Sequence, residues 1–471
     1  MSEPSWASVL PPLLAIALAI ITRQVILSLG IGIWLGFCIL NSVNPLTGLA
    51  QAIDGVINVF SDAGDTRVLV FTLIIGGLIG TIEKSGGVRG FIHLLEHRAW
   101  VNSPRRAQWL AYVTGLVIFI ESNITLLVAG AISRPLFDRY QLSREKLAYV
   151  IDSTSAPVCI MLPFNAWGAV VLTLLTSAMV ENPVDVFIAS IPLNFYAIAA
   201  ILLVAVVIAR GIDIGPMKKA AERTRNGMLL WPGTTPMVDP ALLQETEQSG
   251  PADKARYMIV PIAVMVISMP VSLLVTGDGD LSAGSGSTSV LWAVLLALAS
   301  AWVLTLSARR LSVEELMTIF LRGAGGLLPV SMILLFALAL GDVANLLGTG
   351  LYVAGVAEAA IPVSLLPVIL FLTSCVISFS IGSSWGAFAI MIPLAMQIGI
   401  SLEVSLPLFL AAVLSGSVFG DHASPISDTT VVSSMAAATD HVDHVRTQLP
   451  YALIAAAIAS VGFLVAGILS G

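Results

Sequence analysis

The sequence reads GDHASPISDTT at residues 420–430, inside an otherwise apolar stretch that begins with LPLFLAAVL and ends with VVSSMAAA. Pro425 has no backbone N–H and disfavours a continuous helix. A charged side chain at the centre of a bilayer costs on the order of 3 kcal/mol. The stretch therefore predicts a membrane helix that is unwound at mid-depth and carries functional carboxylates, Asp421 and Asp428, beside His422.

The composition is that of a polytopic, all-α membrane protein. Of the 471 residues, 57% are hydrophobic and 11% are charged, whereas soluble domains carry roughly 25% charged residues. Apolar runs of about 18 residues or more, each long enough to cross a bilayer, recur along the chain. The net charge of −7 does not suggest a nucleic-acid partner. Cysteines at 38, 159 and 375 lie in apolar segments without CxxC spacing, which indicates neither disulfides nor a zinc site.

A charged segment at 210–255 divides the chain into near-equal halves, 1–209 and 256–471. Lys and Arg mark cytoplasmic loops, so we expect this linker to be cytoplasmic, as are the basic loops at 84–106 and 134–146. Loops without Lys or Arg should face outside, together with both termini; the sequence places such loops at 42–66 and 276–288. Candidate spans lie at about 289–306 and 325–345, and no helix is predicted between them.

Two apolar segments predict re-entrant hairpins. Basic loops flank 107–133 on both sides, and a simple span cannot put both loops in the cytoplasm. A hairpin that enters from the cytoplasm, turns near Glu121–Thr125 and returns places both loops on the cytoplasmic side. Its counterpart at 361–398 belongs to a charge-free run that is too long for one span and breaks near IGSSWG, 381–386. Each half is thus expected to have about five transmembrane helices and one hairpin.

The broken helix predicted at 404–438 has a partner at 147–180, where Asp152 precedes STSAP. An odd number of spans inverts the second half relative to the first, so the chain is predicted to consist of two inverted repeats. In transporters of that kind the transport site lies near the bilayer midplane, where the repeats meet.

Carboxylates, hydroxyls and freed carbonyls at the two breaks make oxygen-rich surroundings suited to a hard cation such as Na+. Na+ is assigned above all to Asp421, Ser427 and Asp428. The alternative for the acids is that they cap half-helices or pair with histidine. The candidate ion- or proton-binding residues are Asp152, Asp421, His422, Ser424, Ser427, Asp428, Thr429 and Thr430.

Polar side chains at the hairpin tips and beside the first break are candidates for receiving an organic solute. Trp167 and Trp385 sit at related places and would wall such a solute, or else serve helix packing. For the others the alternatives are turn caps and small packing residues. The candidate solute-binding residues are Glu121, Ser122, Asn123, Asn165, Ser383, Ser384 and Trp385.

Two histidine motifs have plain explanations. HLLEH at 93–97 matches an inverted zinc-protease pattern but lies in a basic loop, where ordinary amphipathic surface is the favoured interpretation. DHVDHVR at 440–446 is interpreted as a charged helix end at the interface. A proton-sensing role for His441 and His444 is the sharper alternative, because histidine titrates near neutral pH.

The stretch GSVFGDHASPISDTTVVSSMAAATDHVDHVRTQLPYAL (416–453) resembles the signature of the NhaC family of Na+/H+ antiporters, within the ion transporter superfamily. The likeness extends to FIESNITLLVAGAISRPLFDRY (119–140). The resemblance implies a scaffold domain, a transport domain built from two hairpins and two unwound helices, an elevator-like movement and a homodimer. Ala423 stands where many members have Cys, so no thiol role applies there. The family's polar motif falls on Asp421, His422, Ser424, Pro425, Ser427, Asp428, Thr429 and Thr430.

Two transport functions remain open at this point. In the first, the protein exchanges Na+ for H+ across the bacterial inner membrane, and Asp421 or Asp428, with or without Asp152, binds either cation. In the second, it carries a small amino acid or carboxylate, and Na+ only drives transport. An intramembrane hydrolase using serine, His422 and aspartate is disfavoured, because adjacency in sequence is not triad geometry. We expect no cofactor, with Na+ as coupling ion or substrate.

Overall fold

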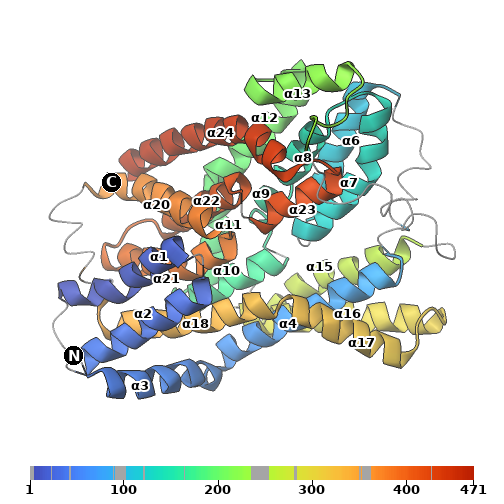
Figure 1. Cartoon of the computed structure of the whole chain (residues 1–471). Coiled ribbons are helices and arrows are strands. Elements are labelled where there is room, and N and C mark those ends of the chain that lie inside the picture. The colour runs from blue at the N-terminus through green and yellow to red at the C-terminus, as the bar shows by residue number, and fades with distance from the viewer. Residues whose placement is uncertain are drawn as a thin grey trace.

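The computed structural model describes residues 5–22, 24–41, 44–87, 90, 102–119, 122–163, 165–234, 254–279, 284–349, 352, 362–425 and 427–470. Within these ranges the regular secondary structure is helical and contains no strand (Figure 1), which confirms the all-α class. Short 3₁₀ turns supplement the α-helices at η1 (Trp6–Val9), η2 (Val59–Ser61), η3 (Ile191–Leu193) and η4 (Val363–Leu365).

One group of helices lies near the N-terminus in Figure 1. Helix α2 contacts α1, α3 and α18. Asn44 caps α3 by accepting from the N–H groups of Leu46 and Thr47, as expected of an N-cap asparagine. The bounds are α1 (Leu10–Thr22), α2 (Val25–Leu40), α3 (Pro45–Asn58) and α18 (Leu328–Leu346).

A second group contains α4 (Ala63–Lys84), α15 (Arg256–Thr276), α16 (Gly286–Ser307) and α17 (Val313–Gly326). Helix α4 contacts the other three. Its Gly76 faces Gly323 of α17 so closely that a Cβ on Gly76 would lie 2.4 Å from the Gly323 carbonyl oxygen. Small residues at helix contacts in membranes allow such backbone approach, so these glycines set the separation of α4 and α17.

A third group surrounds α22 (Leu406–Ala423), which is buried along most of its length. Helix α22 contacts α20, α21, α24, α12 and α11. The other bounds are α11 (Pro183–Ser190), α12 (Phe195–Arg210), α20 (Leu366–Ile381), α21 (Ser384–Ser401) and α24 (His441–Ser470).

The remaining helices form a fourth group at the end of the molecule away from both termini (Figure 1), apart from α10, which runs back toward the middle. Helix α7 contacts α6, α8 and α23. The bounds are α6 (Pro104–Val117), α7 (Ser122–Arg139), α8 (Arg144–Asp152), α9 (Ala156–Cys159), α10 (Ala166–Ser177), α13 (Gly215–Arg225) and α23 (Asp428–Ala437).

The lengths and apolarity of the helices are those of a multi-pass membrane protein. Among the described residues seven helices are long and apolar enough to cross a bilayer, or up to nine if each bent pair counts as one span. The bent pairs are Pro183–Leu193 with Phe195–Arg210 and Val313–Gly326 with Ser331–Leu346. Inverted repeats and the membrane sides of the loops stay predictions.

Three helices lie in segments where the sequence predicts no helix: α3, α13 and α17. Between the candidate spans at 289–306 and 325–345, where no helix was predicted, α17 begins with a capping box. The Ser312 hydroxyl accepts from the Glu315 N–H, and the Glu315 carboxylate accepts from the Ser312 N–H. This S-x-x-E signature is present in the sequence, but an amphipathic helix lacks the continuous apolar run that marks a transmembrane span.

The basic segment expected as a loop at 134–146 is mostly helical, because α7 continues through Arg139 and α8 begins at Arg144. Three successive side chains in the first turn of α8 are buried and bonded to different elements. Arg144 binds Asp138 of α7 and the Ala438 carbonyl after α23. Glu145 accepts two hydrogen bonds from Arg223 of α13, and Lys146 binds the Asp213 carboxylate. The start of α8 is therefore held by three neighbours.

Helices α20 and α22 approach closely through Gly416 and Gly420. A Cβ on Gly416 would lie 2.3 Å from the Phe371 carbonyl oxygen, and one on Gly420 would lie 2.4 Å from the Phe379 nitrogen. Ser378 of α20 also donates to the Ser417 carbonyl, 2.5 Å away. These contacts bring the end of α22 against the turn between α20 and α21.

Gly416→Ala is expected to destabilise the protein by about 1–3 kcal/mol, because the added methyl overlaps backbone atoms of α20. Gly325→Ala on α17 is the matched control, since nothing lies within 4 Å of a Cβ built there. The midpoint of thermal unfolding in detergent is the measurement. Midpoints that fall equally in both variants would contradict the close α20–α22 contact.

Candidate functional site

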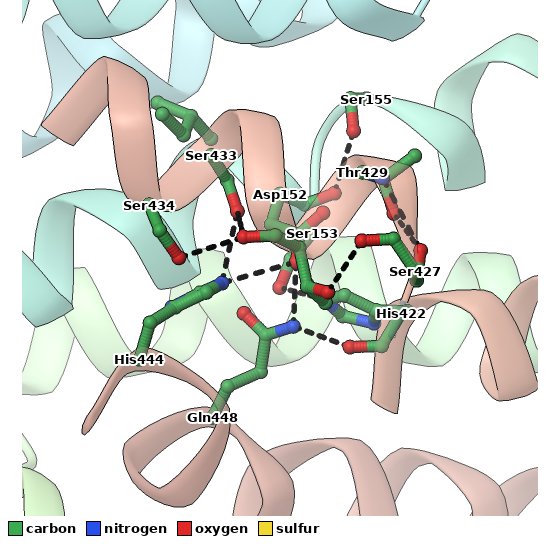
Figure 2. Close-up of polar contacts among 12 residues, drawn as sticks. Asp152, Ser153, Ser155, His422, Ser427, Thr429, Ser433, Ser434, His444 and Gln448 are labelled. Carbon is green, nitrogen blue, oxygen red and sulfur yellow. Dashed lines mark hydrogen bonds and ion pairs between the residues drawn. The ribbon is translucent and has the colours of Figure 1, made fainter. Parts of the chain in front are cut away.

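Two interrupted helices, one from each half of the sequence, meet at the candidate site. The first breaks after α8 at Asp152, resumes briefly as α9 and breaks again before α10. The second breaks between α22 and α23. Helix α23 packs against α8, and α22 packs against α9. The polar residues of both breaks therefore gather in one buried region (Figure 2).

Asp421 lies in the last turn of α22 and is buried, with 1% of its surface exposed. The hydroxyl of Ser384 donates to its Oδ2, and the hydroxyl of Ser427 donates to its Oδ1. An ionised carboxylate is acceptor-only, so both bonds suit the charged form. Ser384 begins α21, so the hairpin predicted at 361–398 and the broken α22 contribute to one cluster.

The hydroxyls of the motif mostly hold its turn. Ser427 caps α23 by accepting from the Thr429 N–H at 3.2 Å, and the two hydroxyls lie 3.0 Å apart. Thr430 Oγ1 donates to the carbonyls of Ser424 and Ser427 at 2.9 and 3.0 Å. The Ser424 hydroxyl donates to the Phe379 carbonyl at 2.7 Å. Within this set, the Ser427 hydroxyl donates to the Asp421 carboxylate.

Some predicted residues lie wholly or partly outside the part of the chain that the structure describes. Asp428 begins α23, but its side chain is outside that part, as is the side chain of Asn123 in α7. Glu121 and the HLLEH motif at 93–97 lie outside it entirely. Ser122 begins α7 and is buried. The roles predicted for these residues stay predictions.

The hairpin and break residues expected to meet a solute are engaged as caps. Ser383 accepts from the Gly386 N–H at 3.4 Å and caps α21, directly after Gly382, whose φ of 73° favours glycine. Asn165 caps α10 by accepting from the Gly168 N–H at 2.9 Å. Its amide nitrogen donates to the carbonyls of Phe119 and Cys159. Asn165 thus ties α9, α10 and the segment after α6 together.

The two tryptophans contact each other. The rings of Trp167 and Trp385 have centroids 4.7 Å apart, and Phe388 lies edge-on to Trp167. A cavity beside Asn165 has a volume of about 10 Å³, which is the room of about one water molecule. In this conformation the tryptophans serve packing, and that cavity is too small for an organic solute.

Asp152 lies in a second network, formed with residues of α24. Its Oδ2 accepts from Gln448 Nε2 at 2.7 Å and lies 3.3 Å from His444 Nε2 (Figure 2). Gln448 also donates to the carbonyl of His422. The sequence analysis did not select Gln448 and interpreted His444 as part of an interfacial helix end. That interpretation is wrong for His444, because its side chain is fully buried.

His422 joins the two networks. It directly follows Asp421, its Nε2 lies 3.0 Å from the Ser153 hydroxyl, and its Nδ1 lies 2.7 Å from the Tyr196 hydroxyl. Its Nε2 lies 3.9 Å from Asp152 Oδ2. His422 therefore connects α22 to the first break and to α12, with both ring nitrogens engaged.

His441 lies at the start of α24 and is less buried than His444. Its Nε2 is 2.7 Å from the Pro425 carbonyl, and its Nδ1 is 3.1 Å from the Ser434 hydroxyl. A polar stripe at 441, 444 and 448 thus follows one face of α24 into the site. These residues are spaced three and four apart, so they share one face of a helix that continues into an apolar run. That spacing in the sequence could have identified Gln448 as a residue of the site.

Comparison with known proteins gives consistent results. The Na+/H+ antiporter family profile matches residues 170–468. An uncharacterized protein of Haemophilus influenzae is 34% identical over 99% of this chain and 91% of its own length. The malate-2H+/Na+-lactate antiporter of Bacillus subtilis is 38% identical over 20% of each chain. Neisseria gonorrhoeae MtrF, described among antimetabolite efflux pumps, has a TM-score of 0.59 at 14% identity, covering 90% of this chain and 85% of its own. This last likeness concerns the fold alone.

Proposed function

Because this chain belongs to the Na+/H+ antiporter family, we propose that it exchanges Na+ for H+ across the bacterial inner membrane. It is a secondary transporter and a multi-pass membrane protein, and the hydrolase hypothesis is set aside because the family is one of transporters and not of enzymes. The observation that carries the exchange proposal is Asp421, a buried carboxylate held by two hydroxyls at a helix break.

The chemistry follows from competition for one carboxylate. Removing a carboxylate from water disfavours its charged form, so a buried aspartate is neutralised by a proton or by a cation. When Na+ occupies the site, the hydroxyls of Ser384 and Ser427 turn their lone pairs to the ion. When a proton occupies it, they bond to the protonated carboxyl. Asp428, at the start of α23, is proposed as a further Na+ ligand.

The wider architecture is proposed to be the one that the resemblance to the NhaC family implies. Two inverted repeats, each of about five transmembrane helices and a hairpin, would form scaffold and transport domains that move as an elevator, with the protein a homodimer. Support comes from the two interrupted helices, which belong to different halves of the sequence and pack against each other. Paired broken helices at a repeat interface are a feature of such transporters.

Ser384→Ala and Ser427→Ala are each expected to raise the Na+ concentration at half-maximal exchange by about tenfold to a hundredfold, since a lost bond to a charged group costs roughly 1.5–3 kcal/mol. The assay is the response of an internal pH dye in proteoliposomes to added Na+. Ser460→Ala on α24, where the hydroxyl donates only to the Ala456 carbonyl, is the matched control. An unchanged Na+ dependence in both site variants would remove these hydroxyls from the Na+ site.

Na+-coupled transport of a small amino acid or carboxylate is the second candidate. This candidate is favoured by the name of the Bacillus subtilis relative, a malate-2H+/Na+-lactate antiporter, whose match covers a fifth of this chain. Asn165, Ser383 and Trp385 would then be exposed to solute in another conformation. Uptake of radiolabelled amino acids and carboxylates by proteoliposomes, with and without a Na+ gradient, separates the two. Na+-dependent accumulation of any of them would replace pure cation exchange.

A further inference from the structure

Gln448 is a buried polar residue of α24 to which the exchange proposed at Asp421 assigns no role. It lies one turn beyond His444, and 1% of its surface is exposed. Its side-chain amide enters the region where the two interrupted helices meet (Figure 2). A glutamine amide neither gains nor loses a proton near neutral pH, so its contribution lies in the groups that it bonds.

The amide nitrogen of Gln448 bonds two acceptors that belong to different halves of the sequence. Nε2 donates to Asp152 Oδ2 at the end of α8, at 2.7 Å. It also donates to the His422 carbonyl in the last turn of α22, at 2.5 Å. An amide nitrogen has two protons, and these two bonds use both of them. One side chain of a third helix thereby joins the two helix breaks.

The two acceptors fix the orientation of this amide. An ionised carboxylate and a backbone carbonyl can only accept hydrogen bonds. Exchanging the amide nitrogen and oxygen of Gln448 would turn Oε1 toward two other oxygens with no proton between them. The position of Nε2 therefore follows from the chemistry of its partners, which is how amide orientations are assigned.

The His422 carbonyl lies at a helix end, where carbonyl groups need a donor from outside. Carbonyls in the last turn have no partner within their own helix, and Gln448 supplies the donor for this one. Asp421 is the preceding residue in the chain. The bridge from α24 therefore holds the backbone directly beside the carboxylate proposed to exchange Na+ for a proton.

The side chain of His422 is held as well. Its two ring nitrogens contact the hydroxyls of Ser153 in the first break and Tyr196 on α12. With the Gln448 bond to its carbonyl, residue 422 is fixed through both its side chain and its backbone. The end of α22 is thus tied to three other parts of the molecule, and Gln448 provides the tie to its backbone.

Packing alone does not account for Gln448. Its Oε1 is buried and has no hydrogen-bond partner among the described residues, and an unpaired buried polar atom is unfavourable. An apolar side chain of similar length, such as methionine, would fill the same space without leaving a polar atom unpaired. What the amide adds over such a side chain is its pair of bonds to Asp152 and His422.

We propose that Gln448 is a positioning residue of the exchange site: its bridge between Asp152 and the His422 carbonyl holds Asp421 in the geometry that binds the cation. This inference rests on the proposed Na+/H+ exchange. Without the bridge the end of α22 adopts other positions, and only a fraction of the molecules is ready to bind Na+. The apparent affinity falls by that fraction, whereas saturating Na+ restores the binding geometry.

Gln448→Met removes both bonds and keeps the length of the side chain. It is expected to raise the Na+ concentration at half-maximal exchange about tenfold and to leave the maximal rate within about twofold of the wild type. The measurement is the internal pH-dye response of proteoliposomes over a series of Na+ concentrations. Gln397→Met is the matched control and should keep both values, since Gln397 is a buried glutamine of α21 that donates to Asn345 at 2.6 Å.

A purely structural role predicts the opposite division of the effect. Fewer transporters would then be active, so the maximal rate would fall at an unchanged half-maximal Na+ concentration. That result, or wild-type values for both quantities, overturns the proposal. Gln448→Asn keeps the amide but is one methylene shorter, and it should raise the half-maximal concentration by a smaller factor. It decides the question if Gln448→Met does not fold, and an unchanged half-maximal concentration in it then overturns the proposal.

Na+ binding is measured separately, so that a failure of the inference can be told from a failure of the proposed function. Na+ that binds the folded protein raises its thermal unfolding midpoint in detergent, and Gln448→Met should need about tenfold more Na+ for the same rise. If the wild type binds Na+ in this way without exchanging it for protons, the proposed function fails, and the Na+ dependence of Gln448→Met still decides the positioning role. A wild type that Na+ neither drives nor stabilises overturns both.

Discussion

Asp421→Asn is expected to reduce Na+-driven proton movement in proteoliposomes at least about a hundredfold. The amide of asparagine can neither bind a proton at neutral pH nor offer Na+ a negative charge. A loss of about 3 kcal/mol, typical of removing an interaction with a charged group, already corresponds to this factor. The measurement is the internal pH-dye response to a Na+ step, normalised to the amount of reconstituted protein.

Asp54→Asn is the matched control, since Asp54 is an exposed carboxylate on α3 and should retain full exchange. Asp421→Asn should fold, because asparagine has nearly the same shape and can still accept at its oxygen from one of the two serines. Full exchange by Asp421→Asn, in a variant with a normal elution profile and melting midpoint, would sink the assignment of the exchange site.

Glu145→Leu is expected to destabilise the protein by about 3–5 kcal/mol, because it leaves the guanidinium of Arg223 buried without its carboxylate. The two side chains are 0% and 1% exposed and bonded by two contacts of 2.6 and 3.0 Å. Arg223 also donates to the Met228 and Leu229 carbonyls and lies over the Trp231 ring. The readout is the midpoint of thermal unfolding in detergent.

The double variant Glu145→Leu/Arg223→Met should recover most of that loss, because replacing both members of a buried ion pair by apolar residues is often close to neutral. Glu314→Leu, at the exposed start of α17, controls for adding an apolar side chain. A double variant as unstable as the single one would show that the pair is not the source of the stability.

The local pattern around Asp421 was sufficient to predict the part of its surroundings that comes from its own segment. Pro425 stops α22 at Ala423, and Ser427, two residues later, is a natural cap for α23. Both features follow from residue types within one short segment. A carboxylate placed between them inside an apolar run is costly unless it is bonded, so its burial and its serine partner were predictable in kind.

Contacts between distant segments were not predictable in the same way. Ser384 was expected to receive a solute, but its hydroxyl donates to the Asp421 carboxylate. This contact forms because the glycines of α22 let that helix pack closely against α20 and the turn that follows it. His444 and Gln448 reach Asp152 across nearly 300 residues of sequence. Tertiary packing decides which face of α24 turns inward. The sequence of a charged helix end is the same whether that end is exposed or buried, so the sequence alone does not distinguish the two.

The three anchored side chains at the start of α8 restrict how any movement can occur. Arg144, Glu145 and Lys146 connect one helical turn to α7, to the end of α23 and to α13. A helix fastened in three directions cannot slide or rotate by itself without breaking buried ion pairs. During a transport cycle α8 and α13 would therefore move together as one rigid unit. Spin labels on α13 and α4 would then change their separation, while labels on α13 and α8 would keep theirs.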